Sequence, residues 1–97
     1  MTTRAKICYG YNSYHGGWVC EKSFYVNYDG YPENIIPMIK NGNTDKFEEL
    51  EDFNDFGDVD YIYYVEENRR IRVVAFDWNF FSNFLVDSYK LVEEVSF

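Results

Sequence analysis

The chain has 97 residues, of which 46% are hydrophobic and 22% aromatic, so it can form one core and is too apolar to be disordered. Its formal net charge is −8, and the acidic side chains are concentrated after residue 44. A field of this sign repels nucleic acid and anionic membranes and attracts basic proteins. We therefore expect a single domain over residues 1–97 that contacts neither nucleic acid nor membranes directly.

The first residues carry Arg4 and Lys6 and lack an apolar segment of signal-peptide length. No stretch of the chain approaches the roughly 20 apolar residues of a membrane span. The sequence therefore predicts a cytoplasmic protein. Cys8 and Cys20 could be neighbours on two adjacent strands. Thiols are usually reduced in the cytoplasm, so we expect both cysteines to be free.

An N-terminal β-hairpin is predicted from two runs of alternating side chains, over residues 4–11 and 18–28. Between them, Gly16 and Gly17 can adopt positive φ angles at little steric cost. Asp29 and Gly30 form turns, which ends the second strand.

A short helix is predicted next, over residues 35–41, with Asn34 as its N-cap. Gly42 follows it in a position that favours helix termination. A second helix is predicted over residues 45–54, because apolar side chains recur there every three positions, at Phe47, Leu50 and Phe53. The remaining positions of this second helix are mostly acidic and would face solvent.

A second hairpin is predicted over residues 59–66 and 70–76, where aromatic and β-branched residues are enriched. Arg69, Arg70 and Arg72 lie at its tip and along its second strand, and we expect them to pair with carboxylates across the strands.

The last twenty residues fit two structures. Helical spacing is present at five apolar positions, which are Phe81, Phe84, Leu85, Tyr89 and Val92. Phe84-Leu85-Val86, followed by Ser88-Tyr89-Lys90-Leu91, also suits an edge strand. The predicted fold is therefore α+β: two antiparallel hairpins form one sheet, with one or two short helices between them on one face, in the order ββααββ, followed by a C-terminal helix or edge strand.

No catalytic or cofactor motif is present in the sequence. His15 is the single histidine, and with Cys8 and Cys20 it lacks the paired ligand spacing of zinc sites. Its expected position is a solvated loop. The glycines do not form a phosphate-binding loop. We therefore expect no metal, no cofactor and no enzymatic activity.

Ten acidic residues lie between positions 45 and 67, and Lys46 is the single base that offsets them. One interpretation is a solvated helix face followed by a loop. The other is a surface for a basic protein, because carboxylates about 5–7 Å apart on a helix approximate the phosphate spacing of a nucleic acid. The candidate partner-binding residues are Asp45, Glu48, Glu49, Glu51, Asp52, Asp55, Asp58, Asp60, Tyr61 and Tyr63.

The stretch Tyr28-Asp29-Gly30-Tyr31-Pro32-Glu33, which follows an aromatic strand and leads into Asn34-Ile35-Ile36-Pro37, resembles a group of small phage and prophage proteins. In these proteins a strand ends in an Asp-Gly-Tyr-Pro turn, and a helix and a further aromatic strand follow. The resemblance covers roughly residues 4–76. It implies a host-interaction or anti-defence role in the host cytoplasm, as in anti-CRISPR proteins that mimic nucleic acid with acidic surfaces.

Two functions follow from these observations. The first is an inhibitor that binds a basic host protein, one that itself binds nucleic acid, through the acidic residues. The alternative is an accessory or structural protein that self-associates through its tyrosine-rich sheet, for instance as a homodimer. Salt distinguishes the two, because it weakens contacts between opposite charges more than apolar contacts.

Overall fold

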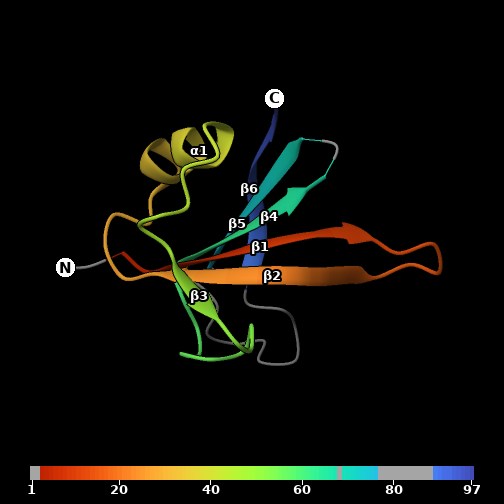
Figure 1. The fold of residues 1–97 in the computed structure, drawn as a ribbon, viewed down its shortest axis with the longest axis horizontal. Coiled ribbons are helices and arrows are strands. Elements are labelled where there is room, and N and C mark those ends of the chain that lie inside the picture. Colours follow the sequence, from red (N-terminus) through yellow and green to blue (C-terminus); the bar gives the residue numbers. More distant parts are fainter. Residues whose placement is uncertain (1–2, 68, 77–88) are drawn as a thin grey trace.

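In the computed structural model, residues 3–67, 69–76 and 89–97 are described, and they form a six-stranded mixed sheet with one helix (Figure 1). The order of strands across the sheet is β3-β2-β1-β4-β5-β6. The elements in chain order are β1 (Ala5–Asn12), β2 (Trp18–Val26), α1 (Pro32–Lys40), β3 (Glu48–Leu50), β4 (Tyr61–Glu66), β5 (Arg70–Phe76) and β6 (Tyr89–Ser96).

Both predicted hairpins are present. β1 pairs antiparallel with β2, with a bulge at Tyr9/Gly10, and β4 pairs antiparallel with β5. The two hairpins are joined by a parallel pair, in which β1 lies against β4 with Ala5 opposite Tyr61. This parallel pairing places β1, the first strand of the chain, in the middle of the sheet. It lies between β2 and β4, which both come later in the sequence.

The two faces of the sheet are covered by different segments. On the first face, α1 contributes Ile35, Ile36 and Ile39 to the larger core, which also contains Ile7 and Tyr63. On the second face, a smaller core contains residues from β2, β3 and β4 together with Val59. Figure 1 shows α1 on one side of the sheet and the chain that follows β3 on the other.

The Asp-Gly-Tyr-Pro turn has structural functions at each position that the structure describes. Asp29 has a φ of 56°, and Gly30 donates a hydrogen bond of 3.0 Å to the carbonyl of Thr3. A Cβ at Gly30 would lie 2.8 Å from that carbonyl oxygen, so only glycine fits without a backbone shift. Tyr31 is the N-cap of α1 and Pro32 occupies its first turn, where a missing N–H costs nothing.

The first predicted helix is confirmed with a different start. α1 begins at Pro32 rather than at residue 35, so Asn34 lies inside the first turn and is not the N-cap. Its end agrees with the prediction, because Gly42 follows the C-cap Asn41 with a φ of 68°.

The predicted second helix over residues 45–54 is wrong. Glu48–Leu50 forms β3, a short edge strand on β2, and turns surround it. The apolar side chains that suggested a helical stripe belong to opposite faces of the sheet, since Phe47 packs in the first-face core and Leu50 in the second-face core. A chain that crosses the edge of a sheet can therefore place apolar residues three apart without being helical.

The predicted ββααββ fold is consequently corrected to a mostly β structure with a single helix among the described residues. Of the two C-terminal alternatives, an edge strand is present, but it spans Tyr89–Ser96 rather than the predicted 84–91, and it pairs with β5. The helical spacing at Phe81, Phe84 and Leu85 lies outside the described residues. A bulge at Val92 interrupts the two-residue alternation of β6, which is why its pattern did not indicate a regular strand.

The expectation of two free cysteines is also wrong, because Cys8 and Cys20 form a disulfide. Cys8 faces Ser23 and Cys20 faces Gly10 in the register of β1 and β2, so the two residues are diagonal neighbours. Their Cα atoms are 5.8 Å apart, a distance that a disulfide spans without backbone movement. The prediction of free thiols relied on the expected cytoplasmic compartment, whereas the register of β1 and β2 determines how close the two cysteines lie.

Candidate partner-binding surface

The acidic residues gather along one edge of the sheet. We call this surface the acidic edge and define it as the exposed carboxylates between residues 45 and 58, on β3 and its flanking turns. Its members are Asp45, Glu48, Glu49, Glu51, Asp52, Asp55 and Asp58. The predicted spacing along a helix face is wrong, because these side chains extend from an edge strand and turns.

Two basic residues, Lys6 on β1 and Arg4 just before it, hold the acidic edge against the sheet. The ammonium group of Lys6 donates a hydrogen bond of 2.8 Å to the carbonyl of Gly57, and the guanidinium of Arg4 donates one of 2.6 Å to the carbonyl of Asp58. Lys6 also lies 5.4 Å from the centre of the Phe53 ring. The cations thus contact backbone oxygens and a ring, which leaves the neighbouring carboxylates exposed.

Lys6 is a buried cation beneath the acidic edge. Burial lowers its pKa, and the carboxylates of Asp58, Asp55 and Asp52 oppose that shift. The acidic residues therefore stabilise the charged form of the lysine that fastens their own segment. Electrostatics and local structure are coupled here.

Aromatic packing fixes the tip of the same segment. Phe56 stacks on Tyr25, with ring centres 4.4 Å apart and planes 13° from parallel. Its φ of 68° is an uncommon backbone conformation for a bulky residue, so the surrounding contacts must hold it there. Phe56 is still 54% exposed, which makes it an apolar group within a charged surface.

Most carboxylates of the acidic edge form no direct ion pair among the described residues. Glu49 is the exception, since its Oε1 lies 3.7 Å from the Nζ of exposed Lys22. An exposed pair at this distance contributes little to stability. Asp52 accepts a hydrogen bond of 2.9 Å from the N–H of Asn54 and so shapes the turn.

Two hollows flank β3. One has a volume of about 370 Å³ and lies between the end of β2, α1 and Glu48, with Tyr28, Asp29 and Lys46 also in its lining. The other has a volume of about 280 Å³ and is lined by charged residues of β2 and the acidic edge together with Leu50 and Phe53. Each hollow combines carboxylates with apolar side chains, as a binding site for a long cationic side chain requires.

Three of the predicted site residues are not part of this surface. The carboxylate of Asp60 accepts a hydrogen bond of 3.0 Å from the backbone N–H of Arg4 and is partly buried. Tyr63 is fully buried and donates a hydrogen bond to the carbonyl of Gly30. Tyr61 is half-buried and packs against Tyr31. Side chains alternate between the two faces along β4, and Tyr61 and Tyr63 both lie on the first face. They are therefore not part of the acidic edge.

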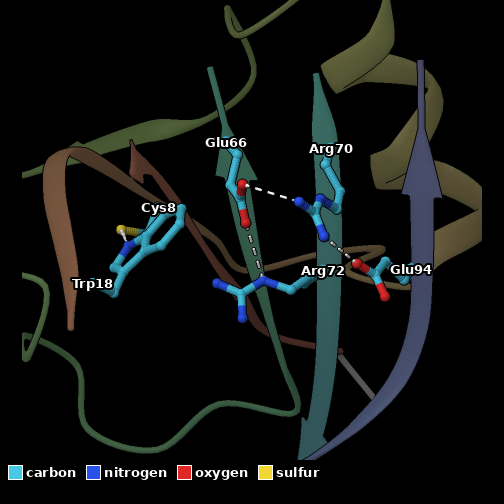
Figure 2. Close-up of polar contacts among 6 residues, drawn as sticks. All are labelled: Cys8, Trp18, Glu66, Arg70, Arg72 and Glu94. Carbon is cyan, nitrogen blue, oxygen red and sulfur yellow. Dashed lines mark hydrogen bonds and ion pairs between the residues drawn. The ribbon is translucent and has the colours of Figure 1, made fainter. Parts of the chain in front are cut away.

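A second polar cluster lies on the second face, and its charged side chains come from β4, β5 and β6 (Figure 2). The predicted cross-strand pairing of arginines is confirmed for Arg70, which lies 2.9 Å from Glu94 and 3.7 Å from Glu66. Arg72 pairs with Glu66 at 3.5 Å. The hydrogen bond to Glu94 and the charge of Glu66 raise the pKa of Arg70. These arginines are neutralised within the chain.

Sequence reasoning missed Trp18 in this cluster. The guanidinium of Arg72 lies 5.3 Å from the Trp18 ring and 5.6 Å from the Tyr64 ring, and the Trp18 N–H is 2.9 Å from the sulfur of Cys8 (Figure 2). A tryptophan at the start of β2 gives no sequence signal for partners on β4 and β5, two and three strands away in the sheet. The cluster stabilises the hairpin tip of β1 and β2 through cation–π contacts.

No family model, curated protein or solved structure matches this chain. Among residues 3–67, 69–76 and 89–97, no helix is long and apolar enough to cross a membrane. In the same ranges, no group of three or more histidine, cysteine or acidic side chains is arranged to hold a metal ion. His15 is exposed in the turn between β1 and β2.

Proposed function

We propose that this protein binds a basic surface of another protein through the acidic edge, and that this surface is the nucleic-acid site of its partner. The observation that carries the proposal is the set of exposed carboxylates on a firmly held segment, most of which form no ion pair among the residues that the structure describes. A charged surface that is already ordered loses little conformational entropy on binding. Binding there would exclude nucleic acid and inhibit the partner.

The chemistry of the surface supports a protein partner. Exposed Phe56 supplies an apolar anchor within the acidic edge, and the hollows beside β3 offer space for the stems of lysine or arginine side chains. Complementary charges raise the association rate and select the partner, while apolar anchors reduce dissociation. The net charge of −8 favours approach of a basic protein over the whole molecule.

The test compares two baits of equal net charge. In the first bait, Glu48→Lys and Glu51→Lys reverse two charges of the acidic edge, at exposed positions where no side-chain hydrogen bond or ion pair is described. In the control, Glu33→Lys and Glu67→Lys reverse two exposed charges elsewhere. We expect proteins captured from a bacterial lysate by the wild-type and control baits to be lost from the first bait, with affinity reduced at least about tenfold.

A captured protein supports the proposal only if it binds nucleic acid and this chain competes for that site. Competition is measured with the purified partner and a labelled oligonucleotide, at salt concentrations from about 0.05 to 0.5 M. We expect the complex to weaken steeply with salt. Equal capture by both variants, or simultaneous binding of oligonucleotide and protein, would refute the proposal.

A further inference from the structure

The opposite edge of the sheet is formed by β6, which spans eight residues and pairs on its inner side with β5. Two adjacent apolar side chains are exposed on it, Leu91 at 55% and Val92 at 48%. An edge strand presents unpaired backbone N–H and C=O groups, and natural proteins usually shorten or charge such edges. β6 is long and carries an apolar pair at its middle.

The bulge determines which residues of β6 share a face. Glu93 is opposite Val73, and Leu91 is opposite Val74, so Val92 is the additional residue. Lys90 is opposite Ala75, which places it on the same face as Glu93, whereas in a regular strand residues three apart point to opposite faces. The bulge thus brings a cation and an anion to one face, on either side of the apolar pair.

We infer that β6 pairs antiparallel with β6 of a second copy of this chain. An isologous pair about a two-fold axis perpendicular to the sheet requires that opposing residues share a face. With Leu91 opposite Val92 of the second copy, Lys90 is opposite Glu93 of the second copy, and both lie on the first face. This register gives two symmetric ion pairs, each between Lys90 of one copy and Glu93 of the other, on either side of an apolar centre. Over residues 90–93 no like charges face each other.

The inner side of β6 holds the strand in place for this contact. Glu94 is bonded to Arg70, the N–H of Phe97 donates a hydrogen bond of 2.8 Å to the carbonyl of Arg69, and the hydroxyl of Tyr89 bonds to Val59. The dimer doubles the six-stranded sheet and places one acidic edge at each end. Such an arrangement could engage two basic sites at once, although the pairing itself does not depend on the proposed function.

Charge reversal tests the register. Lys90 and Glu93 are exposed, and no side-chain hydrogen bond or ion pair is described for either. Lys90→Glu alone and Glu93→Lys alone each oppose like charges, so we expect sedimentation equilibrium to show dimerisation weakened at least about tenfold. Lys90→Glu with Glu93→Lys restores opposite charges and should restore the dimer. Circular dichroism confirms that each variant is folded.

A one-strand interface is small, so the measurement extends to about 0.5 mM protein. The expected mass of the wild type at the highest concentration is twice the 11.7 kDa of the chain. A wild type that stays monomeric overturns the inference, and so does a dimer that all three variants leave unchanged. Loss of partner binding in the acidic-edge variants with the dimer intact would separate this interface from the proposed function.

Discussion

The two edges of the sheet differ in how their charged and apolar side chains are used. At β3 the strand is three residues long and its carboxylates are exposed, while Leu50 is buried on the second face and Phe47, just before the strand, on the first. At β6 the strand is eight residues long, one of its carboxylates is bonded to Arg70, and Leu91 and Val92 are exposed. A short charged edge resists addition of another strand, whereas a longer edge with an apolar centre permits it. One sheet thus offers two surfaces with opposite preferences.

The two edges should differ most in how much stability is lost when an apolar side chain is truncated. Phe47 packs against Phe24 with ring centres 5.9 Å apart and is buried beside β3. Phe47→Ala should lower the free energy of unfolding by about 3–4 kcal/mol, because it leaves a cavity in the first-face core. The matched change Leu91→Ala in β6 should cost less than about 0.5 kcal/mol in dilute protein. Urea unfolding measures both, and equal costs would contradict the contrast.

Alkaline pH should weaken the connection between the two edges. The Tyr89 hydroxyl donates a hydrogen bond of 3.0 Å to the carbonyl of Val59 and accepts one of 3.0 Å from its N–H, which joins β6 to the end of the acidic edge. Burial raises the pKa of Tyr89 above its ordinary value of 10.0, and burial does the same for Tyr9 and Tyr63. Since these raised pKa values belong to the folded state, their stabilisation is complete below pH 10 and is lost as pH rises further.

We therefore expect the free energy of unfolding to fall as pH rises above about 10. Urea unfolding at several pH values measures this dependence, and Tyr89→Phe should reduce the slope while lowering stability at neutral pH by about 1–3 kcal/mol. Tyr14→Phe is the control, because Tyr14 is exposed and should change neither quantity. A stability that remains constant to pH 11 would exclude this role for the buried hydroxyls.

A smaller effect should distinguish local from global stability. Lys6→Met removes the hydrogen bond to Gly57 and the contact with Phe53, so amide protons of residues 55–59 should exchange about tenfold faster, while those of β6 keep their rates. Lys40→Met removes the same charge from the exposed end of α1 and is the matched control. Exchange measured by NMR that is unchanged in this segment would show that Lys6 does not hold the acidic edge.

Sequence patterns predicted the elements whose contacts are local. Both hairpins were predicted from alternation and turn residues, and the end of α1 from Gly42. The arginine pairs of the second hairpin followed from cross-strand proximity. In these cases neighbours along the chain, or across one tight turn, determine the structure, so the spacing of residue types is sufficient.

Only the tertiary structure decided the features that depend on distant segments. The spacing of Phe47, Leu50 and Phe53 is typical of a helix. In the structure, residues 48–50 of this segment pair with β2 as an edge strand, and its apolar residues are divided between two cores. The parallel pairing of β1 with β4 buried Tyr63 and excluded it from the predicted surface. The sequence by itself determined that the carboxylates lie close together in the chain. Which of them face solvent, and at which edge, follows from strand order, because burial is set by contacts between segments that composition and periodicity do not encode.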